Sequence, residues 1–171
     1  MLKPDQPVPA LDLPLTIGAR YDLSKQHPEH FTMLVFYRGK HCPICRSYLE
    51  ELGGKLEDFV AAGVNVAAVS MDNEDRAMVA HNDWKTGDVP LVYGLTEDQA
   101  RAWGLYISQG RDDSGEPSMF SEPGLFLIRP DGRLYFASIQ NAPFTRPPLD
   151  QLLEGISFVT EKGYPVRGTL T

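Results

Sequence analysis

Cysteine is scarce in this chain of 171 residues, and the sequence features typical of zinc-binding, membrane-spanning and nucleic-acid-binding proteins are missing. The two cysteines and four histidines do not have the spacing of a four-ligand zinc site. No apolar run approaches the roughly 20 residues that cross a bilayer, so we expect no membrane segment. The formal net charge of −7 offers no basic surface for a phosphate backbone, so we expect no nucleic-acid partner.

The chain also lacks internal repeats, low-complexity segments and linkers. Its length suits one domain with a proper core, and we predict a single domain over residues 1–171. The first residues lack the charged-then-apolar layout of a signal peptide, which predicts a cytoplasmic location. We predict neither a resident cofactor nor a metal site.

The two cysteines stand three positions apart, in Cys42-Pro43-Ile44-Cys45. The apolar run 31–37 before them is typical of a buried strand, and apolar residues after them repeat with helical spacing. The pair therefore lies where a strand gives way to a helix. Backbone N–H groups and the dipole at a helix N-terminus stabilise a thiolate, the reactive form of cysteine. Such a pair can close into a disulfide and reopen by exchange, a two-electron switch.

Three other interpretations of the pair compete with this one. A structural disulfide stabilises mainly by closing a long loop, and this loop is short. A zinc site needs four ligands, and the chain has no second cysteine pair to complete one, although His41 adjoins Cys42. Two inert buried thiols would suit an apolar core, since free cysteine packs well there. The polar and cationic neighbours Lys40, His41 and Arg46 favour the redox interpretation instead.

The rest of the sequence alternates between strand and helix patterns, which predicts an α/β protein with a central sheet flanked by helices. A capping box at Thr96 and Gln99 opens one helix, Asp72 is expected to cap another, and Gly163 ends the last. Trp84, Trp103 and Tyr93 are expected in the core. Strands are expected at 31–37, 64–70, about 91–93, 125–129 and 134–139, with short edge strands at 10–13 and 20–23. Helices are expected at 43–62, 73–85, 96–103 and 148–162, and an irregular loop at 106–122.

This order of elements resembles the thioredoxin fold, and more closely its peroxiredoxin branch, the AhpC/TSA family. Residues 36–45, Phe-Tyr-Arg-Gly-Lys-His-Cys-Pro-Ile-Cys, resemble that family's motif of Phe-Tyr-Pro, three residues, Thr, two residues, Cys. Residues 69–72, 95–105 and 125–132 resemble later blocks. The likeness covers roughly residues 5–160. It implies a thioredoxin-like fold with a peroxiredoxin-like N-terminal extension.

The chain departs from the family motif at three positions. The family's peroxide-attacking cysteine falls on Cys45, its proline on Arg38 and its threonine on Cys42. The arginine that usually precedes a later strand falls near Pro123. In the family these groups orient peroxide and lower the pKa of the cysteine.

A second resemblance concerns the same motif. Thioredoxins and glutaredoxins carry Cys-x-x-Cys at this place, glutaredoxins with proline after the first cysteine, and a cis-proline opens the strand that faces the dithiol. Pro123, after Glu122, is the candidate for that cis bond, which would bring backbone polar groups beside the dithiol.

Two orders of attack follow from these resemblances. If the pair works as in thioredoxins, Cys42 attacks the substrate and Cys45 resolves the mixed disulfide. If it works as in peroxiredoxins, Cys45 attacks peroxide and Cys42 condenses with the resulting sulfenic acid. Both cycles end in a Cys42–Cys45 disulfide, and both need a reductant, a small thiol or a thioredoxin-type protein. The three departures slightly favour Cys42 as the first nucleophile.

The leading hypothesis is a thiol-dependent oxidoreductase that reduces peroxides or disulfides. His41 is a candidate proton carrier, and Arg38 and Arg46 are candidate thiolate-stabilising cations. The alternative is a non-catalytic redox sensor or adaptor whose loop 141–147, with an amide, an aromatic ring and a cation, contacts a protein partner. A second copy of the chain, forming a homodimer, is a further candidate partner.

Overall fold

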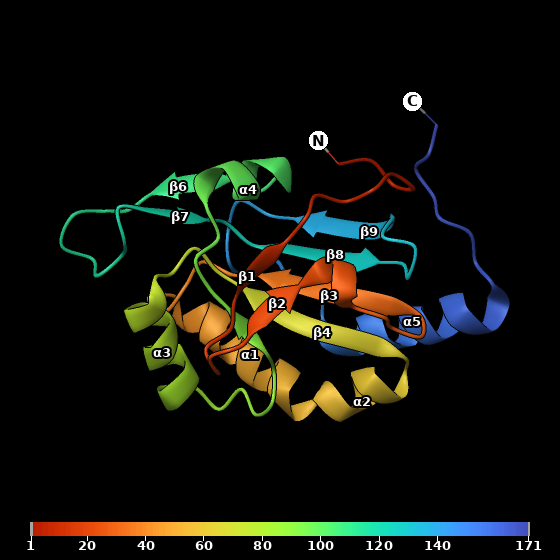
Figure 1. The fold of residues 1–171 in the computed structure, drawn as a ribbon, viewed down its shortest axis with the longest axis horizontal. Coiled ribbons are helices and arrows are strands. Elements are labelled where there is room, and N and C mark those ends of the chain that lie inside the picture. The colour runs from red at the N-terminus through yellow and green to blue at the C-terminus, as the bar shows by residue number, and fades with distance from the viewer. Residues whose placement is uncertain (1, 171) are drawn as a thin grey trace.

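The computed structural model describes residues 2–170, and its centre is a five-stranded mixed sheet (Figure 1). The strand order is β5-β4-β3-β8-β9, with β3, β4 and β5 parallel and β8 and β9 antiparallel to their neighbours. The strands are β3 (Phe31–Phe36), β4 (Val64–Val69), β5 (Leu91–Val92), β8 (Gly124–Ile128) and β9 (Leu134–Ile139). The predicted α/β class with a mixed central sheet is confirmed.

Strand β3 holds the middle of the sheet because it can bury both of its faces. All six of its residues are buried, which suits a continuous apolar run rather than an alternating one. Met33 and Val35 belong to the core on one face, while Leu34 and Phe36 belong to the core on the other. The carboxyl end of this strand is therefore a rigid support for the cysteine motif that follows it.

Helices cover the first face of the sheet, and the N-terminal segment covers much of the second (Figure 1). The first core contains apolar residues of α1 (Pro43–Gly54), α2 (Leu56–Ala61), α3 (Glu74–Asp83) and α5 (Leu149–Lys162). The second core contains residues of the hairpin formed by β1 (Asp12–Pro14) and β2 (Arg20–Asp22), and of α4 (Glu97–Ala102). A short 3-10 helix, η1 (Leu23–Lys25), follows that hairpin.

Two helix predictions need correction. The predicted helix 43–62 is two helices, because the backbone leaves helical geometry at Lys55, directly after Gly53 and Gly54. Glycine is a poor helix former, so a break at this pair is reasonable. The cap of α3 is Asn73, whose side chain accepts from the Arg76 N–H; Asp72 does not cap it.

The irregular loop predicted at 106–122 is wrong in part. It contains a two-stranded hairpin, with β6 (Ile107–Gln109) antiparallel to β7 (Met119–Ser121). Strands of three residues are too short to give a period-two signal among polar neighbours. The hairpin matters for the site because Phe120, in β7, packs against Arg38 and His41, which shortly precede the cysteines.

Three other predictions are confirmed: the capping box at Thr96 and Gln99 is present, Gly163 ends α5 in the left-handed conformation, and Trp84 and Trp103 are buried. Tyr93, also expected in the core, is only half-buried. No helix within residues 2–170 is long and apolar enough to cross a membrane.

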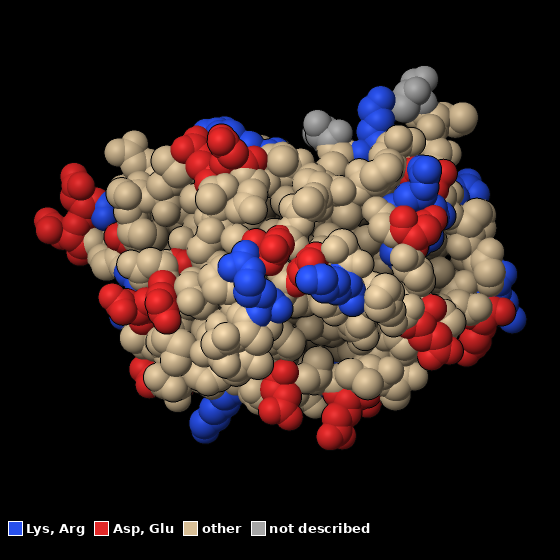
Figure 2. All heavy atoms as spheres, viewed as in Figure 1, with Lys and Arg blue, Asp and Glu red and all other residues tan. Residues whose placement is uncertain are grey.

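On the face shown in Figure 2, basic side chains lie dispersed among acidic ones. Two of the basic residues of the N-terminal segment are paired with aspartates: Arg20 with Asp12 and Lys25 with Asp22.

Candidate functional site

Cys42 and Cys45 form a disulfide at the N-terminus of α1. Cys42 is the N-cap residue, and its Sγ accepts a hydrogen bond from the Cys45 N–H at 3.2 Å. Pro43 occupies the first turn, where its missing N–H leaves no intrahelical bond unmade. The helix N-terminus therefore supports the sulfur of Cys42 directly, as the sequence predicts. Both cysteines are nearly inaccessible, with 2% of Cys42 and 0% of Cys45 exposed.

The loop between β3 and α1 is fixed by a buried carboxylate from the neighbouring strand connection. Asp72 accepts the Lys40 N–H at 2.7 Å and the Arg76 Nε–H at 2.9 Å, and its side chain is fully buried. Gly39 has φ +122 and packs against this carboxylate so closely that a Cβ would lie 2.5 Å from Asp72 Oδ1. The position of Lys40, two residues before the dithiol, is thereby tied to β4 and α3.

The cation that reaches a sulfur is Arg146, from the loop between β9 and α5. Its Nη2 lies 3.2 Å from Cys45 Sγ, across 101 positions of sequence. Arg46, the sequence candidate next to Cys45, instead binds Glu50 at 2.8 Å and the Asp83 carbonyl. Sequence reasoning missed Arg146 as a site residue. The mixed amide, aromatic and cationic composition of the loop 141–147 was the one signal that pointed there.

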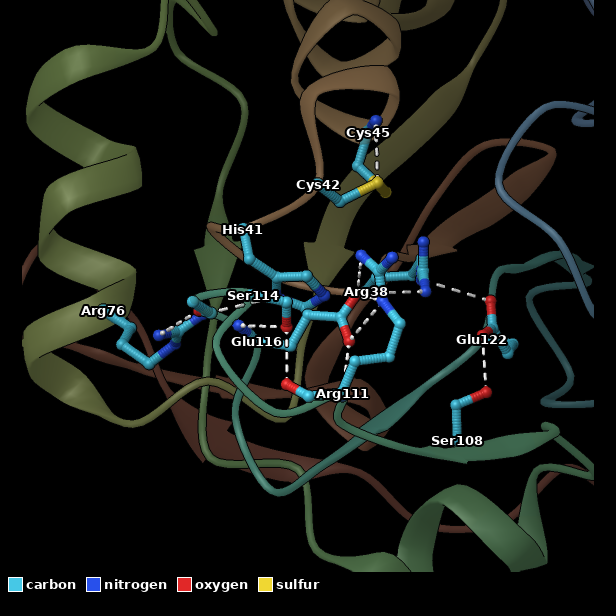
Figure 3. Close-up of polar contacts among 11 residues, drawn as sticks. Arg38, His41, Cys42, Cys45, Arg76, Ser108, Arg111, Ser114, Glu116 and Glu122 are labelled. Carbon is cyan, nitrogen blue, oxygen red and sulfur yellow. Dashed lines mark hydrogen bonds and ion pairs between the residues drawn. A yellow bond between two sulfur atoms is a disulfide. The ribbon is translucent and has the colours of Figure 1, made fainter.

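His41 lies beside the motif without a recorded bond to either sulfur. Its Nδ1 is 3.3 Å from Arg76 Nη2, and its ring packs against Phe120 in a tilted arrangement with centroids 4.7 Å apart. In Figure 3 the ring points away from the two cysteines. Burial, with the neighbouring Arg38 and Arg76 guanidinium groups, lowers the pKa of His41, which favours its neutral form. A role for His41 as a proton carrier stays a prediction.

Arg38 belongs to a network of charges that the β6–β7 hairpin completes (Figure 3). Arg38 Nε lies 3.4 Å from Glu122 Oε2, an ion-pair distance without hydrogen-bond geometry. The guanidinium also lies 4.5 Å above the Phe120 ring. Glu122 is buried, and its other oxygen accepts from the Ser108 hydroxyl at 2.6 Å. Glu116 extends the network by pairing with Arg111 at 3.0 Å.

This network gives Arg38 a partner that the sequence did not predict. Glu122 was noted only as the residue before Pro123, and it is a buried acid at the site. Its carboxylate partly neutralises the charge of Arg38. A role for Arg38 in stabilising a thiolate stays a prediction.

The prediction of a cis bond before Pro123 is wrong, because residues 2–170 contain no cis peptide bond. Only Glu122 and Pro123 separate β7 from β8, and a trans bond lets the extended chain run from one strand into the next. The carbonyl of Pro123 accepts the Gln140 N–H at 3.0 Å, which joins this segment to the start of the loop that carries Arg146.

Metal binding has no obvious place in the described part of the chain. Residues 2–170 contain no group of three or more His, Cys, Asp or Glu side chains that could hold an ion.

Comparison with known proteins decides the family. The model of the AhpC/TSA family matches residues 4–137. The chain belongs to the AhpC/TSA family. A protein of Mycobacterium tuberculosis strain H37Rv, Rv2521, described as a candidate peroxiredoxin, is 25% identical over 142 residues, which are 80% of this chain and 84% of that protein.

Solved peroxiredoxin structures share the fold of this AhpC/TSA protein. A cysteine-to-serine mutant of peroxiredoxin 6 from Arenicola marina matches with a TM-score of 0.81 at 18% identity, over 95% of this chain and 76% of that one. Peroxidoxin BcpB from M. tuberculosis matches with a TM-score of 0.74 at 18% identity, over 93% and 99% of the two chains. Family membership makes the chain a thiol-dependent oxidoreductase, as predicted.

Proposed function

We propose that this protein reduces peroxides by cycling Cys42 and Cys45 between a dithiol and a disulfide. The observation that carries the proposal is the Cys42–Cys45 disulfide at the N-terminus of α1, in a chain of the AhpC/TSA family. Each sulfur has a hydrogen-bond donor within 3.2 Å, the Cys45 N–H for one and Arg146 for the other. Both donors favour a thiolate over a thiol, since hydrogen bonds to a charged group stabilise its charged form.

The cycle needs two bond exchanges and one external reductant. A thiolate attacks one peroxide oxygen, the O–O bond breaks, and water or an alcohol leaves after taking up a proton, so that the sulfur becomes a sulfenic acid. The second cysteine attacks that sulfur, the S–S bond forms, and the sulfenic oxygen leaves as water. Two thiol groups of a reductant then return the pair to the dithiol and are themselves oxidised to a disulfide.

The reductant has one route suggested by the surface. A groove of about 240 Å³ lies beside the first turn of α1, between that helix and the loop 141–147. Its lining residues are Ile44, Ser47, Tyr48, Glu51, Pro143, Phe144 and Arg146. A small thiol or a thioredoxin-type protein would approach the nearly inaccessible cysteines from this side, because Arg146, which lines the groove, contacts Cys45 Sγ.

Replacement of each cysteine tests the cycle. We expect the wild-type protein to turn over hydrogen peroxide repeatedly with dithiothreitol, and Cys42→Ser and Cys45→Ser to lose sustained turnover through the Cys42–Cys45 disulfide. A Cys45→Ser protein with full peroxide and disulfide turnover would refute the proposal. Mass spectrometry of the oxidised wild type supplies the direct check, because the cycle requires loss of two hydrogens per chain.

Disulfides are the second class of substrate that the dithiol could reduce. The rate of thiolate loss with hydrogen peroxide, compared with the rate with a small model disulfide, separates the two. We expect the peroxide reaction to be faster; a faster reaction with the disulfide would make thiol–disulfide exchange the main activity.

A non-catalytic sensor remains the second candidate, favoured by the exposure of Phe144 at 73% in the loop beside the dithiol. An exposed aromatic ring next to a redox switch suits contact with a protein partner. Stoichiometric oxidation without repeated turnover, under small-thiol and thioredoxin-type reductants alike, would support the sensor and contradict the enzyme.

We further propose that the chain is one domain over residues 1–171, works in the cytoplasm and forms a homodimer. A disulfide that forms only transiently suits a reducing compartment, which supports the location. Limited proteolysis tests whether the chain is one domain. Fractionation of cells that express the tagged protein tests its location, and sedimentation of the purified protein tests whether it is a dimer.

A further inference from the structure

The β6–β7 hairpin forms a small sheet of its own, and its tip, residues 110–118, is a compact unit. Within residues 2–170 its two strands pair only with each other. Inside the tip the Arg111 N–H donates to the Glu116 carboxylate at 2.8 Å, and the Ser114 hydroxyl donates to the Arg111 carbonyl at 2.7 Å. In Figure 1 the tip extends beyond both strands on the side of the molecule that carries α3. The tip can therefore move as one piece without breaking the central sheet.

One guanidinium, that of Arg76 in α3, joins the tip to the loop that precedes the dithiol. Its Nη1 and Nη2 each lie 3.4 Å from the carbonyl oxygen of Gly115, in the tip. Its Nη2 also lies 3.3 Å from Nδ1 of His41, the residue before Cys42. Its Nε donates to Asp72 at 2.9 Å, which holds the arginine side chain in place. Arg76 thus bridges three separate parts of the chain.

The bond between Arg76 and His41 requires a neutral histidine. A guanidinium has five N–H donors and no acceptor, so His41 Nδ1 is the acceptor of this bond. A proton on Nδ1 would turn the acceptor into a donor and place a second positive charge against the guanidinium. The other ring nitrogen, Nε2, is buried without a partner among the described residues, so the charged ring has no acceptor on that side either. Protonation of His41 therefore breaks the bridge at its centre.

Four charged groups face the His41 ring, and histidine is the one side chain here whose ordinary pKa lies between pH 5 and pH 7. The four are Arg38 after β3, Asp72 after β4, Arg76 in α3 and Glu116 in the tip. Hydrogen bonds from Arg111 hold the pKa of Glu116 at about 2, so this carboxylate stays ionised throughout that range. Burial and the two guanidinium groups lower the pKa of His41, so its ring is neutral at pH 7 and takes up a proton only in the acid range.

We propose that the β6–β7 hairpin is a pH-sensitive lid on the loop that precedes the dithiol. Arg76 holds the lid closed while His41 is neutral, and a proton on His41 releases it. The closed lid buries Phe120, whose ring centre lies 4.7 Å from that of His41 and 4.5 Å from the Arg38 guanidinium carbon. The Glu116 side chain is 5% exposed and lies 3.9 Å from Arg38 Nη2. Opening would uncover Arg38 and His41, the polar residues of the loop that leads into the dithiol.

Two spin labels measure whether the lid opens. In the oxidised full-length protein the native cysteines are held in their disulfide. The free thiols are then those introduced by Asp112→Cys, in the tip, and Asn82→Cys, in α3, at two exposed positions. Nitroxide labels on them report the distance from lid to helix by double electron–electron resonance. We expect mainly a short distance at pH 7.5, and a ratio of long to short distances about tenfold higher at pH 5, the effect of losing one hydrogen bond with a charged partner.

His41→Asn in the labelled protein identifies the sensor. The asparagine Oδ1 can replace Nδ1 as the acceptor from Arg76 and carries no charge at either pH, so the ratio should change less than about twofold. His27→Asn is the matched control, because His27 is exposed and lies beside the β8–β9 turn, and it should behave as the wild type. Arg76→Lys keeps a cation for Asp72 but replaces the guanidinium that spans three partners. It should open the lid already at pH 7.5, with little further change at pH 5.

An unchanged distance distribution in the wild type, or equal changes in the wild type and in His41→Asn, would overturn the inference. A closed lid in Arg76→Lys at pH 7.5 would do the same. The wild-type series decides the matter even if far-ultraviolet circular dichroism shows that a variant does not fold. No peroxide or reductant enters these measurements, so failure of the proposed peroxide cycle leaves the lid standing, and an immobile lid leaves the cycle standing.

Discussion

Asp72 is the buried group whose removal should loosen the loop that presents the dithiol. Its carboxylate joins the backbone of Lys40, in the β3–α1 loop, to the side chain of Arg76, in α3. The Asp72 side chain is 0% exposed, while that of Arg76 is 24% exposed. We therefore expect Asp72→Ala to destabilise the protein and Asp72→Asn to do so less.

The magnitude follows from the two bonds. A hydrogen bond from a backbone N–H to an ionised acceptor contributes about 1.5–3 kcal/mol. The pair with Arg76 is worth about 1 kcal/mol, because the guanidinium reaches solvent and can rehydrate when its partner is lost. Asp72→Ala loses both, about 3 kcal/mol in all. Asp72→Asn keeps an oxygen for the Lys40 N–H and should lose about 1.5 kcal/mol.

Urea unfolding followed by far-ultraviolet circular dichroism measures the free energy of unfolding of both variants. Asp75→Asn is the matched control: Asp75 lies in the first turn of α3, the helix that carries Arg76, is exposed, and its change should alter stability by no more than about 0.5 kcal/mol. A loss below about 1 kcal/mol in Asp72→Ala, or equal losses in the alanine and asparagine variants, would show that the loop does not depend on this carboxylate.

Two further predictions concern the same loop. Gly39→Ala should cost about 2 kcal/mol or more in urea unfolding, because φ is +122 and the new Cβ would lie 2.5 Å from Asp72 Oδ1. Gly18→Ala, at φ +81 with no atom within 4 Å of its Cβ, should cost only about 1 kcal/mol; equal costs would disprove the steric argument. His41 has a lowered pKa when folded, so the unfolded chain binds more protons below about pH 6.5, and the free energy of unfolding should fall as the pH drops through that range. Thermal unfolding from about pH 7.5 to 5 tests this: His41→Gln should show a weaker pH dependence than the wild type, and an identical slope would contradict the assignment.

Local patterns in the sequence determine most of the fold. The apolar run 31–37, the helical spacing after Cys45 and the stop at Gly163 depend on neighbours along the chain, and the structure places elements at each of them. The exceptions are short or locally ambiguous: the break at Lys55, the hairpin β6–β7, and the choice between Asp72 and Asn73 as a cap. In the last case both residues are good caps, and the long-range bond of Asp72 to Lys40 decides between them.

Sequence alone also identified Cys42 and Cys45 as the candidate redox pair, because a cysteine pair at a strand-to-helix junction needs only local structure to become reactive, and the structure places the two in a disulfide. The partners of that pair were decided by the tertiary structure. Arg146 lies 101 positions from Cys45 and reaches its sulfur only because β9 and α5 return the chain to the N-terminus of α1. Glu122 meets Arg38 because β8 pairs with β3. Charges act through space over a few ångströms. Which charged groups lie near the two sulfurs is therefore set by how the strands pair, and the spacing of residues along the chain does not show it.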